Sequence, residues 1–155
     1  SGFGKDTYIG GEAVFQMNAF GADAEYGHFD TGDGIDASAD GYYIDVFWSP
    51  TGEGRNYSPS DGSFGATAPI RPLGAGGIGH IMFAARYENL DLSDALFGAN
   101  RNETSAYTIG ATWIPVSHVK FQLNYSSTDV DYALAAPTRF DNTIDAVTFR
   151  TQLDW

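Results

Sequence analysis

Hydrophobic and polar residues alternate with a period of two along most of this chain. Since neighbouring side chains of a β-strand point to opposite sides, each alternating segment predicts a strand with one apolar and one polar face. No segment carries an apolar stripe at helical spacing. The sequence therefore predicts an all-β chain with no internal domain boundary in 1–155. About seven strands are expected, near residues 7–17, 20–29, 42–48, 80–90, 106–113, 119–126 and 145–155.

The polar positions of these strands distinguish a barrel from a soluble β-sandwich. A sandwich normally carries many Lys and Glu residues on its outer face, whereas here the polar positions are mostly Thr, Gln, Asn, Ser, Gly and Ala, which suit a water-filled lumen. The connections 18–19 and 115–118 are short, while 30–41, 93–104 and 130–144 are long and polar. Bacterial barrels alternate short periplasmic turns with long external loops. The pattern predicts an antiparallel transmembrane β-barrel.

Aromatic residues fall near the strand ends, on the apolar face. With the C-terminus placed in the periplasm, the tryptophans lie at the periplasmic ends and the tyrosines near the external ends. Two aromatic girdles around an aliphatic band are expected at the two interfaces of a membrane. The predicted girdle residues are Trp48, Trp113, Trp155, Tyr42, Tyr87, Tyr107 and Tyr125, with Tyr26 near the same external ends.

Residues 49–78 are rich in Gly, Pro and Ser and lie on the side where strand parity expects a periplasmic turn. Such a composition excludes a buried strand. We expect a long irregular turn, and the alternative is a plug or a partner-binding element.

The composition narrows the classes of function. The absence of cysteine excludes disulfides, thiolate metal sites and cysteine nucleophiles. Eight Lys and Arg against 20 Asp and Glu give a net charge of −12, which argues against nucleic acid as a partner. No window holds about 18 consecutive apolar residues, so no transmembrane helix is expected. The first residues also lack the apolar run of a signal peptide.

Four stretches of the chain resemble the C-terminal part of the phosphate-selective porin O/P family. They are TGEGRNYSPSDGSFGATAPIRPL (51–73), FAARYENLDLSD (83–94), YTIGATWIPVSHVKFQLNYSSTDVD (107–131) and AVTFRTQLDW (146–155). The resemblance implies a sixteen-stranded, homotrimeric channel of the bacterial outer membrane that passes anions. This chain would supply about seven C-terminal strands, with outer-membrane lipid and the remaining strands of the same porin as partners. Because single-chain bacterial barrels have even strand counts, an odd number near seven also predicts part of a longer porin.

Strand parity points a set of charged side chains into the lumen. The phosphate-binding lysine of the family and most of its arginine ladder have no counterpart here, and a lumen of mixed charge is not an anion filter. We expect passive diffusion of small polar or anionic solutes, phosphate-like anions among them. The alternative for the basic residues is structural pairing with acids on neighbouring strands. The predicted pore-lining residues are Arg86, Lys120, Arg150, Glu12, Glu25, Asp45 and Glu88.

The C-terminal strand has an exposed edge, which suits capture by β-augmentation. The resemblance implies that the barrel-assembly machinery recognises Phe149, Leu153 and Trp155 as an assembly signal.

Nothing in the sequence indicates an enzyme, a cofactor or a metal centre. His28, His80 and His118 lie far apart along the chain, and none has a Ser or Asp at the spacing of a catalytic triad. The acidic run DTGDGIDASAD at 30–40 is faintly similar to a calcium loop. It lacks EF-hand spacing, so we favour a solvated external loop.

Two other classes of protein stay open. In a small structural or adhesive outer-membrane barrel, the long acidic loops would carry the function. Such a protein would show no large conductance steps. A secreted β-sandwich binding module would be soluble without detergent.

Overall fold

The computed structural model describes residues 6–32, 37–58, 60, 63–65, 67–92, 102–133 and 139–154. Within these ranges there is no helix with the length and hydrophobicity to cross a bilayer. The strands are β1 (Thr7–Met17), β2 (Phe20–Thr31), β3 (Ala37–Trp48), β4 (Asn56–Ser58), β5 (Ser63–Gly65), β6 (His80–Asp91), β7 (Asn102–Val116), β8 (Val119–Ala133) and β9 (Arg139–Leu153).

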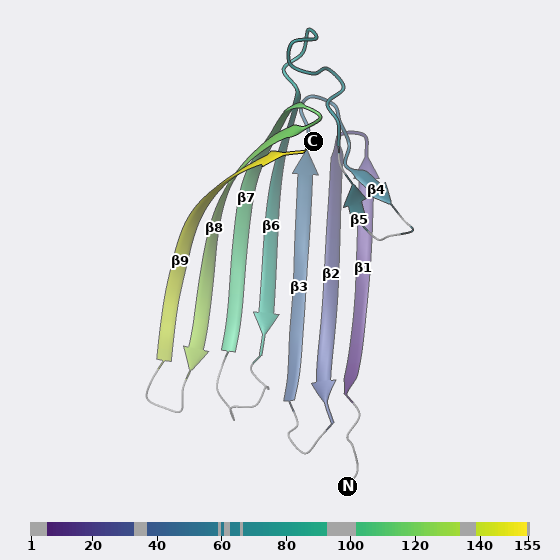
Figure 1. Ribbon diagram of the computed structural model, residues 1–155. Coiled ribbons are helices and arrows are strands. Elements are labelled where there is room, and N and C mark those ends of the chain that lie inside the picture. Colours follow the sequence, from purple (N-terminus) through teal and green to yellow (C-terminus); the bar gives the residue numbers. More distant parts are fainter. Residues whose placement is uncertain are drawn as a thin grey trace.

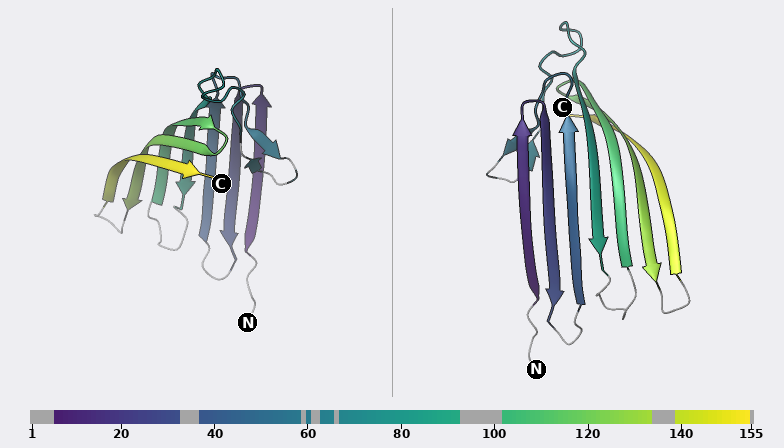
Figure 2. Two further views of the ribbon diagram at one scale, coloured as in Figure 1. Left: turned by 45° about the horizontal axis from the view of Figure 1, so that its top comes forward. Right: turned by 180° about the vertical axis from the view of Figure 1, so that it is seen from behind.

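Seven of these strands pair in one antiparallel sheet, in the order β1-β2-β3-β6-β7-β8-β9, while β4 and β5 form a separate hairpin (Figure 1). The sheet is curved, and β7, β8 and β9 bend strongly toward the end where the chain terminates (Figures 1 and 2). β1 and β9 are its two edges. The prediction of an all-β chain with seven long antiparallel strands is confirmed, and these strands form an open sheet.

The register keeps side chains of one kind on one side of the sheet. Trp48, for example, lies opposite Phe20 on β2 and opposite Phe83 on β6. The pairing of β7 with β8 has one irregularity, between Trp113 and Val116. The alternation within each strand is therefore carried across the whole sheet, which gives it an apolar face and a polar face.

The apolar face is not covered by any described residue. Ile109 is 56% exposed and Leu123 is 51% exposed, although burying such a side chain normally gains about 1.5–3 kcal/mol. Among the described residues, and leaving prolines and glycines aside, the buried apolar residues are Ala37, Phe47 and Ile114. The sheet turns its hydrophobic side chains outward, the reverse of a soluble sandwich.

The strands reach further than the alternation predicted. The connections expected at 30–41 and 130–144 lose residues to the strands on both sides, and the one expected at 93–104 loses its last residues to β7. The reason is that polar side chains there pair across strands. Tyr26 Oη donates to Asp40 Oδ1 over 2.5 Å, and Thr143 Oγ1 donates to Asp129 Oδ1 over 2.6 Å. Such pairs stabilise a sheet as apolar pairs do.

The short turn at 18–19 is confirmed. Asn18 has φ 53°, a left-handed conformation that Asn tolerates better than most residues.

Phe47 is a hydrophobic residue that lies on the polar face of the sheet. It is 1% exposed and lies opposite Gly21, on the polar side of the sheet. A Cβ added at Gly21 would collide with the Phe47 ring. On its other side Phe64 of β5 packs edge-on, with 6.3 Å between ring centroids. The hairpin β4–β5 therefore packs on the polar face at β2 and β3.

Gly21→Ala should destabilise the fold by about 1–3 kcal/mol, because the new methyl group overpacks the Phe47 site. Gly11→Ala is the matched control, since a Cβ at Gly11 meets no atom within 4 Å. That change should be neutral or slightly stabilising, because alanine is favoured over glycine inside a strand. Thermal unfolding measures both variants, and equal shifts would contradict the packing described for Phe47.

Candidate functional site

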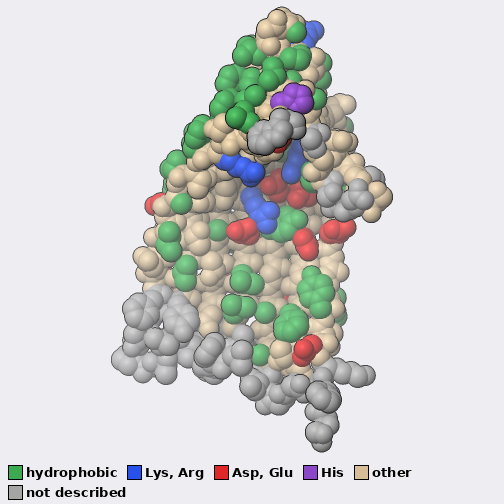
Figure 3. All heavy atoms as spheres, in the orientation of Figure 1, with side chains coloured by type: hydrophobic (Ala, Val, Ile, Leu, Met, Phe, Trp, Pro, Cys, Tyr) green, Lys and Arg blue, Asp and Glu red, His purple; other side chains and the backbone are tan. Residues whose placement is uncertain are grey.

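Charged side chains are concentrated on the polar face of β1, β2, β3 and β6. Figure 3 shows acidic and basic side chains close together near the middle of the side turned to the viewer. The register arranges the residues of this cluster in two adjacent rows, with Asp23, Asp45 and Arg86 in one and Glu12, Glu25, Tyr43 and Glu88 in the next.

Arg55 reaches this cluster from outside the sheet. It precedes β4, and its Nη1 lies 3.4 Å from Asp23 Oδ1 and 3.5 Å from Asp45 Oδ1. Its guanidinium carbon is 3.8 Å from the ring centroid of Phe64 and 5.1 Å from that of Phe47, within the range of cation–π contacts. Asp23 and Asp45 face each other across β2 and β3. One cation thus offsets the repulsion between two carboxylates that lie directly opposite each other.

The approach of Arg55 depends on Gly54. A Cβ added at Gly54 would lie 2.6 Å from Gln16 Nε2 and 2.7 Å from the Asn18 carbonyl oxygen. Glycine therefore lets the chain pass against the turn between β1 and β2. Neither Arg55 nor Asp23 was among the residues predicted to line a lumen. The only signal for Arg55 was a lone basic residue after a glycine, in a segment without periodicity.

Arg86 is the predicted basic residue that the structure brings into the cluster. Its Nε donates to Glu88 Oε2 over 2.7 Å, and its guanidinium carbon lies 3.9 Å from the centroid of the Tyr43 ring. Arg86 and Glu88 are 40% and 49% exposed. The pair leaves part of the guanidinium open to solvent.

Lys120 and Arg150 lie on the polar face of β8 and β9, away from this cluster. Arg150 Nη2 donates to Gln152 Oε1 over 3.2 Å, and Lys120 lies opposite Gln152. Within the described part of the chain neither forms an ion pair. Of the seven predicted pore-lining residues, the structure brings together the five on β1, β2, β3 and β6 and leaves these two apart.

The segment 49–78 is fixed at its base by buried polar contacts. Ser49 Oγ and His80 Nε2 lie 3.0 Å apart, and the two residues are 1% and 2% exposed. Thr51 Oγ1 accepts from the Ile81 N–H over 3.0 Å and donates to the Ile81 carbonyl over 3.3 Å. The end of β3 and the start of β6 are thereby joined, and the segment leaves the sheet from a fixed point.

Glu53 connects two distant parts of the same segment. It is 4% exposed, and its Oε1 accepts from the Ile70 N–H over 2.8 Å. Burial alone would raise the pKa of Glu53. Hydrogen bonding with Thr51, with the Ile70 amide and with its own backbone, together with the nearby His80, holds that pKa below its ordinary value of 4.5. At neutral pH the segment therefore contains a buried, ionised carboxylate.

Two histidines have partners that their sequence spacing did not predict. Ser49 Oγ lies next to His80 Nε2, and His28 Nδ1 is 2.9 Å from Asp40 Oδ1. Strand pairing brings these residues together from distant positions in the sequence. Ser49 is buried, so its hydroxyl does not face solvent and the pair is a structural contact.

The acidic run at 30–40 is divided by the fold. Asp30 lies in β2 and Asp40 in β3, while 33–36 lie outside the described residues. Asp40 accepts from Tyr26 and pairs with His28. No three His, Asp or Glu side chains in the described ranges are placed to hold a metal ion together. The calcium-loop interpretation gains no support from these residues.

Aromatic rings pack in pairs at both ends of the apolar face. Each pair joins neighbouring strands: the four predicted girdle tyrosines pair with one another, and Trp48 and Trp113 each pair with a phenylalanine. Measured between ring centroids, the pairs are Trp48 with Phe83 (6.3 Å) and Trp113 with Phe121 (5.5 Å) at one end, and Tyr42 with Tyr87 (6.1 Å) and Tyr107 with Tyr125 (6.3 Å) at the other.

The predicted assembly signal lies on the edge strand β9. Phe149 and Leu153 are on the apolar face and are 68% and 61% exposed. Phe149 stacks on Phe121 of β8 at 6.4 Å. Trp155, the third residue of the signal and also a predicted girdle residue, lies outside the described residues.

Lowering the pH should reduce the stability of the folded segment 49–78. A carboxyl group whose pKa is lowered by folding stabilises the folded state above its ordinary pKa, here 4.5, and this contribution is lost as the pH falls below that value. Hydrogen exchange at the Ile70 amide on either side of pH 4.5 measures the change. Glu53→Gln keeps an acceptor for that amide but cannot titrate, so it should remove the pH dependence. If both proteins respond to acid alike, Glu53 is not its source.

The chain matches the family model described as phosphate-selective porin O and P over residues 3–155. It is also 34% identical over 118 residues to a Caulobacter vibrioides protein that carries the name "Uncharacterized protein". That match covers 74% of this chain and 23% of the relative, so the chain spans less than a quarter of the relative's length. Because the family model covers nearly the whole sequence, the chain belongs to the phosphate-selective porin O and P family.

Proposed function

We propose that this chain is part of an outer-membrane porin whose polar face lines a water-filled passage for small polar or anionic solutes, phosphate-like anions among them. The two-faced sheet carries the proposal. One face is apolar, exposed and edged by aromatic pairs, and the other holds the charged cluster. Lipid on one side and water on the other require this division along every strand. Diffusion involves no chemical step, so we expect neither an enzymatic activity nor a cofactor.

Strand length supports a membrane-spanning sheet. β6 has 12 residues and β7 has 15, whereas a tilted strand needs about 9–11 residues to cross a bilayer. We place the end with Trp48 and Trp113 in the periplasm and the end with Tyr42 and Tyr107 outside the cell. The segment 49–78 then lies on the periplasmic side and sends Arg55 into the lumen.

Closing the barrel requires further strands. Single-chain bacterial barrels have an even number of strands, and β1 and β9 are open edges of a seven-stranded sheet. From the family to which the chain belongs, we infer a barrel of sixteen strands that assembles as a homotrimer. We also propose that the barrel-assembly machinery recognises Phe149, Leu153 and Trp155.

The charges of the polar face support a passage for polar solutes in general. Asp23 and Asp45 are both engaged by Arg55, and Glu88 by Arg86. Within the described residues two basic side chains on the polar face, Arg55 and Arg86, are thus matched by acids on β2, β3 and β6. A preference for anions would depend on Lys120, on Arg150 and on basic residues from the rest of the barrel.

Arg55→Gln should lower the anion-to-cation permeability ratio of the intact channel, because Asp23 and Asp45 would lose their shared cation. The double variant Arg86→Gln/Arg150→Gln should shift the ratio in the same direction. Reversal potentials in a salt gradient across a planar bilayer measure it, and the shift should be largest at low ionic strength, where screening is weakest. Arg71→Gln is the control from the same segment.

If neither variant changes the ratio, these arginines are structural and do not act on the permeating ion. If the wild-type protein gives no conductance steps, the porin proposal fails and a structural or adhesive barrel becomes the better explanation.

A charge should be tolerated on one face only. Leu123→Arg should cost about 2–4 kcal/mol of stability in a bilayer if the residue lies near the midplane. Asn124→Arg, one residue away, should cost much less because its side chain faces the lumen. Asn124 is a better control than Gln122, since Gln122 lies opposite Arg150. Unfolding in lipid vesicles compares the two, and equal costs would contradict the proposed membrane face.

A further inference from the structure

The loop formed by residues 67–79 extends beyond the sheet at the end where β3 terminates (Figure 1). It carries three exposed aliphatic side chains, Ile70 at 66%, Leu73 at 51% and Ile78 at 59%. Figure 3 shows hydrophobic side chains gathered at this end of the molecule. A contiguous apolar patch of this kind marks a surface that binds another molecule or a membrane.

The loop is held firmly against the end of the sheet. Trp113 Nε1 donates to the Ile78 carbonyl over 2.8 Å, and the Leu73 N–H donates to the Pro115 carbonyl over 2.8 Å. Since Trp113 belongs to the apolar face, these bonds fix Leu73 and Ile78 beside that face. The aliphatic side chains therefore continue the apolar face beyond its ring of aromatic residues.

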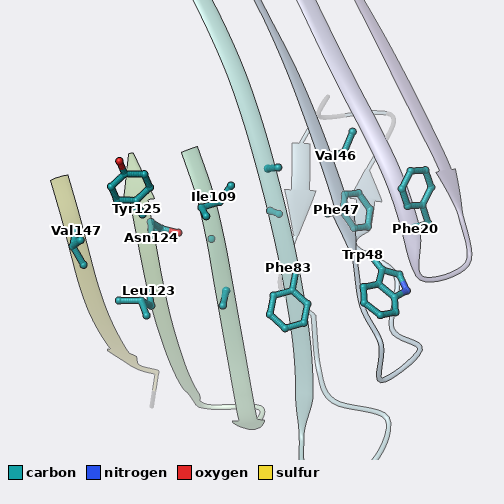
Figure 4. A pocket seen from close by; sticks show the side chains of 14 residues that line it. Phe20, Val46, Phe47, Trp48, Phe83, Ile109, Leu123, Asn124, Tyr125 and Val147 are labelled. Carbon is teal, nitrogen blue, oxygen red and sulfur yellow. The ribbon is translucent and has the colours of Figure 1, made fainter. Parts of the chain in front are cut away.

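A groove of about 540 Å³ lies between the loop and the sheet. Leu73 and Ile78 form its loop side. Phe83, Trp113 and Phe149 contribute to its sheet side. A second apolar groove, of about 610 Å³, adjoins it and shares Phe83, Ala111 and Leu123 with it. Figure 4 shows this second groove, lined by side chains from several neighbouring strands. The two grooves form one elongated apolar channel along the face.

The loop that forms one side of the groove also carries a basic residue, in a hollow that shares Ile78 with the groove. Arg71 is the one Lys or Arg in residues 67–79, and its side chain is exposed. Its carbonyl accepts from the Gly79 N–H over 3.0 Å, which fixes its backbone, and it lines a hollow with Ile70 and Ile78. Glu53, which lines the same hollow, is buried and bonded to the Ile70 amide. The exposed charge at this position is therefore positive, in a chain whose net charge is −12.

We propose that this groove binds a phospholipid of the periplasmic leaflet, with an acyl chain between Leu73, Ile78 and the aromatic wall and the phosphate on Arg71. The proposal rests on the porin function proposed above, since it requires the apolar face to lie in a bilayer. An acyl chain matches the apolar lining of the channel. An anionic headgroup matches the guanidinium, because basic residues beside membrane-facing surfaces bind lipid headgroups. A second copy of the chain would bury the patch but would leave Arg71 without a counter-charge from the described residues around it.

The test uses the full-length porin in nanodiscs of phosphatidylcholine with added phosphatidylglycerol. Native mass spectrometry counts the lipids retained by each subunit and also reports the number of subunits. Leu73→Ser/Ile78→Ser should weaken retention of phosphatidylglycerol by about tenfold or more, because two apolar contacts are lost. The matched control Ile9→Ser/Ile44→Ser makes the same change on the apolar face outside both grooves and should retain lipid like the wild type.

Arg71→Gln separates the headgroup from the acyl chain. It should abolish the preference for phosphatidylglycerol over phosphatidylcholine and leave the total lipid count unchanged, while Lys120→Gln, on the polar face, should keep the preference. Equal retention in the wild type and in Leu73→Ser/Ile78→Ser overturns the site. Loss of subunits from that variant, with no loss of lipid, also overturns it and assigns the groove to a subunit interface.

Failure of the porin proposal gives a different result. Phosphatidylcholine brominated on its acyl chains quenches tryptophans that lie in the bilayer. If it quenches neither the wild type nor the control variant, the apolar face is not in lipid, and both proposals fail. If it quenches both and the channel conducts, while retention does not depend on Leu73 and Ile78, only the lipid site fails.

Discussion

Antiparallel pairing of each long strand with its neighbours is the constraint on which the rest of this structure depends. In a bilayer no water is available to backbone amides and carbonyls, so each strand has to satisfy them on its neighbours. Continuous pairing then makes the two faces a direct result of the period-two alternation. A slip of one residue would move Ile109 and Leu123 to the polar face. The aromatic pairs at both ends of the apolar face connect neighbouring strands and favour the same register.

The charged cluster adds an electrostatic requirement to this scaffold. The register places Asp23 directly opposite Asp45, an arrangement that by itself opposes strand pairing. Arg55 relieves the repulsion, but it can do so only because Gly54 passes against the first turn and because Phe64 packs on Phe47. The segment between β3 and β6 is therefore part of the structural basis of the sheet and also part of its polar surface.

The sequence predicted the features that depend on local order. A period-two pattern can be recognised within a few residues. It predicts the seven strands, the two faces and the positions of the aromatic residues. The contacts of Arg55 with Asp23 and of Ser49 with His80 are not local, since they join residues 32 and 31 positions apart. Residues 49–78 have no periodicity from which such partners could be inferred. Asp40 and Thr143 were expected in loops, because a local pattern does not reveal their cross-strand partners Tyr26 and Asp129.

The buried contacts at the base of the segment 49–78 affect which parts of the proposed channel can change in sequence without disturbing the strands. Ser49, Thr51 and His80 anchor the segment to strand ends, whereas Arg55 and the hairpin lie further along it. Within one connection, some residues thus anchor the segment and another carries the charge that faces the polar side of the sheet. Substitutions in this connection that spare Arg55 and Phe64 would alter the bulk presented to the proposed lumen while Ser49, Thr51 and His80 keep the strand ends joined. In the proposed porin, permeation can therefore change through one connection while the paired strands stay the same.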